Sequence, residues 1–268
     1  MKRFLNSYRA EWLKVFTTRS WWILALVMAL YIGFTAAVLS GLMGSIGMPD
    51  VDIDGINLPR MVYALAPTLG YIFPVLLGAL SVTVEYRHGT LGPTFIWAGG
   101  RERVLGAKVA VQFVMGLVYG VIGIAAAVLA SVFFFLNSGI NTALGDGETW
   151  LQFLRTTVDM GIWAVLGLGV GILVKNQAAA IVIVIVFTQF VEPMARLAGA
   201  VNEKIGNIVG FLPGAASDAF AGNSVYSVMS TGSTYHQLSW WAGGLVLLGY
   251  ACVALIAGAA TRWRADVG

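Results

Sequence analysis

The chain has 268 residues, of which 58% are apolar and 11% are charged, whereas about 25% of the residues in soluble proteins are charged. Sixteen Lys and Arg against thirteen Asp and Glu give a net charge of +3, too small to indicate a nucleic-acid-binding protein. No long stretch has enough polar residues to cover a soluble catalytic domain. The composition therefore predicts an integral membrane protein.

Six apolar stretches are long enough to cross a bilayer, which takes about 20 apolar residues per helix. They cover residues 21–43, 61–84, 104–136, 153–174, 178–198 and 239–261. Pro67 and Pro74 predict a kink in the second span, and Asn137-Ser138-Gly139 predicts the end of the third. We therefore predict an all-α integral membrane protein of six transmembrane helices, with both termini on one side.

The distribution of charge predicts which side that is. With the N-terminus in the cytoplasm, twelve of the sixteen Lys and Arg and four of the thirteen acids lie on the cytoplasmic side. The cytoplasmic side then carries +8 and the outer side −5. Because short cytoplasmic loops of membrane proteins are enriched in Lys and Arg, both termini are predicted to be cytoplasmic.

Residues 2–19 precede the first span and have apolar residues at helical spacing, with basic residues mostly on the other side. The apolar stripe contains Phe4, Leu5, Tyr8, Trp12, Val15 and Phe16. This pattern predicts an amphipathic helix lying in the cytoplasmic interface. The alternative is a merely basic anchor that only sets the topology.

Residues 85–103 form a cytoplasmic loop that is too polar to span the membrane and too short to be a domain. It displays Phe95, Ile96 and Trp97 on the aqueous side. A short apolar segment in this position normally sits in a partner's groove or against lipid head groups. We favour docking on a partner protein.

Two loops lie on the predicted outer side. Residues 199–238 are weakly apolar and broken, which favours short re-entrant helices that dip into the outer leaflet and return. Residues 44–60 contain Asp50, Asp52 and Asp54, but the spacing of a calcium-binding EF-hand is not met, so a solvated acidic loop is favoured.

If the chain is a transporter, its sequence indicates which sources of energy it can use. The nearest approach to a phosphate-binding P-loop, residues 100–109, has the wrong spacing and lacks the hydroxyl after Lys108, so this chain is not expected to hydrolyse ATP. Coupling to an ion gradient calls for ionisable residues near the membrane midplane. Asp159 and Glu192 instead lie near span ends, and Arg155 and Arg196, four residues away, favour interfacial ion pairs.

Two further patterns leave alternatives open. An intramembrane enzyme is the less favoured reading, because His88 and His236 lie outside the spans and no G-x-S-x-G or H-E-x-x-H motif occurs. The GxxxG spacing of Gly116 with Gly120, and of Gly167 with Gly171, allows close helix packing, either within one subunit or between two.

The end of the second span carries a more specific signal. Residues 82–90 read Val-Thr-Val-Glu-Tyr-Arg-His-Gly-Thr, and Glu11-Trp12-Leu13-Lys14, Arg19, Arg101 with Lys108, and residues 167–173 accompany them. With these motifs the chain resembles the six-helix permease subunits of ABC-2-type transporters, especially the small actinobacterial ones. The resemblance covers essentially the whole chain.

The resemblance implies that the loop after the second span is a coupling helix in the cleft of a separate ATPase, with the N-terminal helix as a connecting helix beside it. The implied ATPase-coupling residues are Glu85, Tyr86, Arg87, His88, Gly89, Thr90, Leu91, Phe95, Trp97 and Arg101. The implied connecting-helix residues are Glu11, Trp12, Lys14 and Arg19. Gly92-Pro93 stands where the family often has a basic residue, which predicts a docking helix that is shorter or begins later.

The sequence thus favours a single transmembrane permease domain over residues 1–268, part of an ATP-driven exporter of an amphipathic or hydrophobic substrate. Its expected partners are two cytoplasmic ABC ATPase subunits, a second permease, identical or different, and the lipid bilayer. ATP and Mg²⁺ are expected on the ATPase, with no cofactor, metal or nucleic acid on this chain. The expected location is the bacterial plasma membrane, and an ion-coupled secondary transporter is the runner-up.

Overall fold

The computed structural model describes residues 2–45, 57–98, 100–222 and 238–263, and this part of the chain is helical apart from short connections, with no strand. The helices, in chain order, are α1 (Lys2–Thr17), α2 (Ser20–Ser45), α3 (Leu58–Tyr63), α4 (Leu65–Gly70), α5 (Ile72–His88), α6 (Leu91–Ala98), α7 (Arg101–Asn137), α8 (Gly147–Val174), α9 (Gln177–Val186), η1 (Phe187–Val191), α10 (Glu192–Val201), α11 (Glu203–Val209), α12 (Pro213–Ala221), α14 (Trp240–Gly258) and η2 (Ala259–Trp263).

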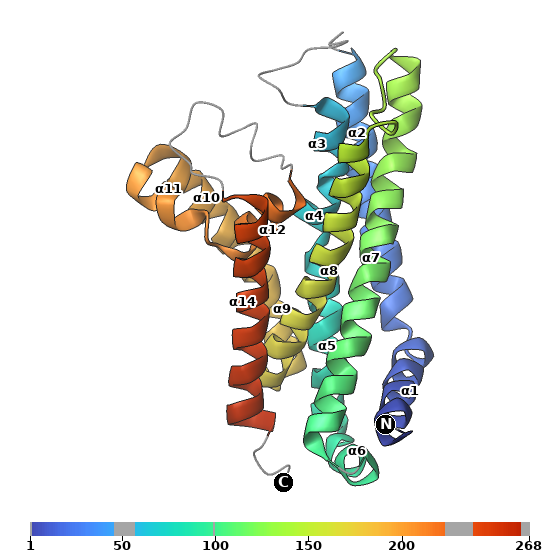
Figure 1. The fold of residues 1–268 in the computed structure, drawn as a ribbon, viewed down its shortest axis with the longest axis vertical. Coiled ribbons are helices and arrows are strands. Elements are labelled where there is room, and N and C mark those ends of the chain that lie inside the picture. Colours follow the sequence, from blue (N-terminus) through green and yellow to red (C-terminus); the bar gives the residue numbers. More distant parts are fainter. Residues whose placement is uncertain (1, 46–56, 99, 223–237, 264–268) are drawn as a thin grey trace.

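Six helical segments are long and apolar enough to cross a membrane, as predicted. They are Ser20–Ser45, Leu58–His88, Arg101–Asn137, Gly147–Val174, Gln177–Gly199 and Trp240–Thr261. The long helices run side by side along the longest axis of the molecule, with α1 and α6 at one end (Figure 1). Trp263 at the end of η2 donates from its indole nitrogen to the Arg101 carbonyl at 3.0 Å, so both ends of the described chain lie at the α6 end.

The second span is broken into α3, α4 and α5, which confirms the predicted kink. The breaks fall at Ala64 and Tyr71, each three residues before a proline. Proline lacks the N–H that would bond one turn back, and its ring crowds the carbonyl of that turn, so the helix bends just before Pro67 and Pro74.

Three short helices lie at and after the end of the fifth span, the first of them, α10, forming its last turns. α10 and α11 form a pair that extends to one side of the bundle (Figure 1), while α12 has eight of its nine residues buried. Short helices were predicted here, but their insertion into the outer leaflet stays a prediction. Residues 223–237, and the acidic loop residues Asp50, Asp52 and Asp54, lie outside the described residues.

The glycine motifs pack helices within this one chain. A Cβ on Gly116 of α7 would meet the Met160 carbonyl of α8, and one on Gly120 would lie 2.7 Å from Thr157 Cα. A Cβ on Gly167 or Gly171 of α8 would meet carbonyls of α5. The close approach of these backbones assigns both motifs to internal packing and not to a dimer interface.

Replacing Gly167 by Ala is expected to lower the free energy of unfolding by about 1–3 kcal/mol, because the added methyl group meets the Val75 carbonyl and forces α8 away from α5. Gly249→Ala on α14 is the matched control, since a Cβ there has no neighbour within 4 Å. Thermal unfolding of both variants in detergent measures the difference. Equal melting temperatures would contradict this packing.

Candidate functional site

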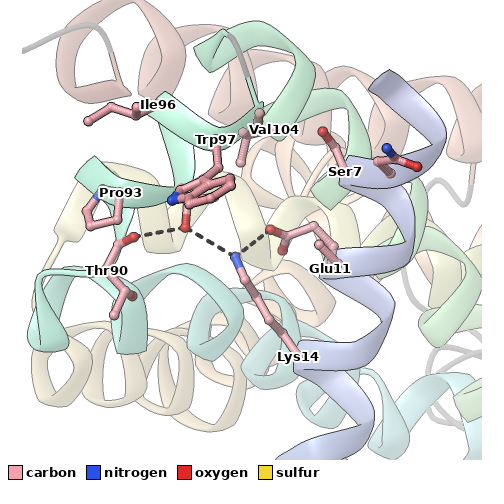
Figure 2. A pocket seen from close by; sticks show the side chains of 12 residues that line it. Ser7, Glu11, Lys14, Thr90, Pro93, Ile96, Trp97 and Val104 are labelled. Atoms are coloured by element: carbon pink, nitrogen blue, oxygen red, sulfur yellow. Dashed lines mark hydrogen bonds and ion pairs between the residues drawn. The ribbon is translucent and has the colours of Figure 1, made fainter. Parts of the chain in front are cut away.

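Four charged side chains from three helices meet at the α6 end of the bundle, and we call them the ion cluster: Glu11, Lys14, Glu85 and Lys108. The Lys108 ammonium on α7 lies 2.7 Å from Glu11 Oε2 on α1 and 2.8 Å from Glu85 Oε1 on α5. The Lys14 ammonium binds the same two carboxylates, at 2.7 and 2.9 Å. Figure 2 shows the contact between Lys14 and Glu11.

The ion cluster is largely withdrawn from solvent. The Lys108 side chain is 1% exposed, and those of Glu11 and Glu85 are 8% and 9% exposed, whereas that of Lys14 is 39% exposed. Burial by itself disfavours the Lys14 ammonium, but the carboxylates of Glu85 and Glu11 outweigh it and raise its pKa above the usual value. Two cations and two anions therefore balance, and they tie α1 to α5 and α7.

The turn between α5 and α6 depends on a glycine. Gly89 ends α5 with φ of 65°, in the left-handed region that other residues enter with strain. The next amide, Thr90 N–H, donates to the Glu85 carbonyl at 3.1 Å. The chain then enters α6 at Leu91, which is fully buried. Helix α6 thus begins directly after the Gly-Thr pair, so of the two alternatives, a later start or a shorter helix, the later start does not occur. At eight residues it is short.

The apolar residues of α6 divide between its two faces. Phe95 packs inward, with its ring 5.0 Å from the Trp263 ring and 5.4 Å from the Arg101 guanidinium carbon. Phe95 is therefore half-buried and displays only part of its side chain, and its role in docking stays a prediction. Ile96 and Trp97 are 82% and 91% exposed, and they form the outward face of the helix.

A groove of about 800 Å³ separates α1 from α6. In Figure 2, Pro93 and Trp97 line it from α6, and Ser7 and Glu11 line it from α1. Thr94 Oγ1, also in this groove, accepts a hydrogen bond from Lys14 at 3.5 Å. The α1–α6 groove is thus open toward the exposed residues of α6 and ends on the ion cluster.

The three motif residues just before Gly89 have side-chain contacts outside the ion cluster. The Tyr86 ring lies 5.3 Å from the Lys175 ammonium, and Arg87 donates to Gln177 Oε1 at 3.3 Å. His88 is exposed and its Nδ1 lies 2.8 Å from the Val84 carbonyl. Tyr86 and Arg87 therefore reach toward the connection between α8 and α9, away from the ion cluster.

The aromatic side of α1 is continuous, as the amphipathic pattern predicts. Trp12 stacks on Tyr8 with ring centroids 6.0 Å apart and meets the edge of Phe16 at 5.0 Å. Phe16 in turn contacts Trp21 at the start of α2, also at 5.0 Å. Arg19, between these helices, is exposed. The aromatic stripe thus carries α1 directly into the first span.

The family follows from a comparison with known proteins. Residues 8–191 match the family described as ABC-2 family transporter protein, a match that includes the ion cluster, α6 and more than half of the chain. The chain belongs to this family. A comparison with curated proteins gives no match. The protein is thus a multi-pass permease of the ABC-2 type, a membrane component that is not itself catalytic.

The permease has a second cluster of buried polar side chains, within the spans and away from the α6 end, which we call the outer cluster. Arg196 of α10 lies between Glu192 at 2.9 Å and Asp218 of α12 at 2.5 Å. Thr68 of α4 donates to Asp218 at 2.9 Å. These side chains are all buried, so polar contacts fasten α12 to the second and fifth spans.

Asp159 of α8 belongs to the same outer cluster. Of the two ion pairs that the sequence predicted at a spacing of four residues, only one forms. The Glu192–Arg196 pair is confirmed, although it is buried and not interfacial. The Arg155–Asp159 pair is wrong: Asp159 accepts from Ser217 Oγ at 2.8 Å, and the Arg155 guanidinium lies over the Trp240 ring at 4.5 Å. The span interiors are therefore less empty of charge than the sequence suggests, and α8 is also joined to α12.

Proposed function

We propose that the permease is the membrane subunit of an ATP-driven exporter whose α6 docks on a separate cytoplasmic ATPase. The observation that carries this proposal is the exposure of Ile96 and Trp97 beside the α1–α6 groove. Large, fully exposed apolar side chains next to a concave surface are typical of a protein interface, where aromatic anchors supply most of the binding energy.

The ion cluster supports a role for α6 in transmitting motion. Glu85 lies at the end of the span that leads into α6, and Lys108 lies in the span that leads out of it. Because Lys108 also binds Glu11, a displacement of α6 by a partner would move α1, α5 and α7 together. Closure of two ATPases on ATP could thus drive two permeases between conformations as rigid bodies.

The remaining parts of the proposal follow from this assembly. ATP and Mg²⁺ would bind to two ATPase subunits, because this chain lacks the P-loop sequence that cradles phosphate. The second permease would be an identical or a different chain, and the assembly would lie in the bacterial plasma membrane with both termini in the cytoplasm. The substrate would be amphipathic or hydrophobic, since the spans present apolar and aromatic walls.

Ile96→Asp is expected to weaken the complex with a co-expressed ATPase by about 2 kcal/mol or more, since a buried charge would replace an apolar anchor. Co-purification of the two chains and transport-linked ATP hydrolysis measure the loss. Ile208→Asp is the control, because Ile208 is 71% exposed but lies on α11, far along the chain from α6. Full retention of the ATPase by Ile96→Asp would refute docking through α6.

A transport assay distinguishes an ATP-driven exporter from an ion-coupled secondary transporter. Vesicles that hold the permease with its ATPase should accumulate substrate only when ATP is supplied. Accumulation driven by an ion gradient without any ATPase would instead favour the secondary transporter, for which the buried acids of the outer cluster would be the first candidates.

A further inference from the structure

A second cavity, of about 430 Å³, lies at the α6 end of the bundle, and we call it the inner cavity. Its apolar wall includes Val15, Leu77, Leu80 and Val84. The lining reaches along α5 from His88 to Leu77, eleven residues or roughly 16 Å at 1.5 Å per residue. That length is about half of a hydrocarbon core of about 30 Å. The volume is within the range of small-molecule sites.

Two hydrogen-bond acceptors beside the inner cavity have no donor within the part of the chain that the structure describes. They are Glu85 Oε2 and Gln112 Oε1, on residues that are 7% and 2% exposed and that both line the cavity. The two lysines of the ion cluster engage the other carboxylate oxygen of Glu85. Buried acceptors are nearly always paired in proteins, because an unpaired one loses its hydration without compensation.

The arrangement of these groups selects one kind of ligand. Gln112 lies one turn beyond Lys108 on α7, so the acceptors are at the ion-cluster end of the cavity, while Leu77 and Leu80 continue toward the membrane interior. Lys14 also lines the cavity, but its ammonium is already held by Glu11 and Glu85. An anionic head group would therefore meet the two unpaired acceptors and the Glu85 charge. A head group rich in N–H donors would satisfy both oxygens, and its apolar body would lie along α5.

We propose that the inner cavity binds an amphipathic primary amine, with its ammonium group near Glu85 and Gln112 and its apolar chain along Leu77 and Leu80. This inference rests on the proposed function in one respect, since it takes the bound amine to be the exported substrate at its entry from the inner leaflet. The binding site does not depend on that assignment and can be tested on the permease alone.

Radiolabelled dodecylamine is the probe, measured on the full-length permease in nanodiscs of phosphatidylcholine, a lipid without N–H donors, with empty nanodiscs subtracted. Dodecyltrimethylammonium has the same charge and chain but no donor, and dodecanoate has only acceptors. Dodecylamine is expected to bind about tenfold more tightly than either, the equivalent of one to two hydrogen bonds. Equal binding of the trimethylammonium compound would overturn the proposal.

Two variants test the location. Gln112→Leu removes one acceptor at nearly constant volume and should weaken dodecylamine binding about fivefold. Leu80→Trp fills the cavity and should abolish binding, whereas Leu248→Trp, on the exposed surface of α14, should leave it unchanged. Unchanged affinity in both cavity variants, with the melting temperature showing that they fold, would exclude the inner cavity as the site.

Further measurements identify the source of the amine. Phosphatidylethanolamine has a head group that is itself a primary ammonium. The permease in nanodiscs that contain this lipid should bind dodecylamine as tightly as the permease in nanodiscs without it. Competition by this lipid would make the occupant a membrane lipid and overturn the substrate assignment. In the complex with the ATPase, dodecylamine should stimulate ATP hydrolysis, and Leu80→Trp should remove that stimulation. Ile96→Asp should lose the ATPase yet bind dodecylamine normally, so failure of docking and failure of the cavity are distinguishable.

Discussion

Lys108→Met is expected to lower the free energy of unfolding of the permease by about 3–5 kcal/mol, since removing one partner of a buried ion pair leaves the other charge uncompensated. Here two carboxylates lose their contact with Lys108, whose ammonium lies 2.7 Å from Glu11 and 2.8 Å from Glu85. Lys14 would remain as their only cation within the ion cluster. Unfolding in detergent, followed by far-UV circular dichroism, measures the change.

Lys14→Met provides the matched control for that result. The same two carboxylates lose a cation, but the Lys14 side chain is 39% exposed, so water screens the interaction and about 1 kcal/mol or less is expected. Adding Glu85→Gln to Lys108→Met should restore part of the stability, because it removes one of the stranded charges. Equal losses for the two lysine variants would show that burial does not determine the strength of these contacts.

Arg196→Met is expected to destabilise the permease by a similar amount, about 3–5 kcal/mol, because it strands two buried carboxylates at the outer cluster. Arg196 is the cation bound to both Glu192 and Asp218. Without it, the like charges of α10 and α12 face each other, and α12 should loosen from the bundle. Hydrogen exchange of the α12 amides, alongside the unfolding measurement, would locate the effect.

The control for the outer cluster is Arg155→Met. This arginine was predicted to pair with Asp159 but lies over the Trp240 ring, a contact expected to contribute about 0.5–1 kcal/mol. Asp218→Asn combined with Arg196→Met should recover part of the stability. A loss as large for Arg155→Met as for Arg196→Met would argue against the outer cluster as the main polar link of α12.

The choice between the two arginines shows what local spacing cannot decide. Both lie four residues from an acid on a helix, and that spacing permits an ion pair in each case. Only Glu192–Arg196 forms, because Asp159 meets the Ser217 hydroxyl, 58 positions further along the chain. A competing partner brought by another helix outweighs a weak local preference.

Helix α6 shows the same effect of tertiary contacts. The sequence shows that Phe95, Ile96 and Trp97 are apolar residues in a cytoplasmic loop, but three consecutive residues of a helix point in different directions. Phe95 faces inward because Trp263, in the last helix, covers it at 5.0 Å. That contact spans most of the chain, so no local pattern indicated it.

The sequence by itself determined the six spans, the break in the second of them, the end of α7 and the motif at the turn into α6. Each of these depends on properties of a short segment: apolar length, the missing N–H of proline, or the freedom of glycine at Gly89. The tertiary structure alone decided which charges that are distant in the sequence meet. Lys108 joins Glu11 across 97 positions, and Arg196 joins Asp218 across 22, because a buried charge needs a partner and packing of separate helices supplies it.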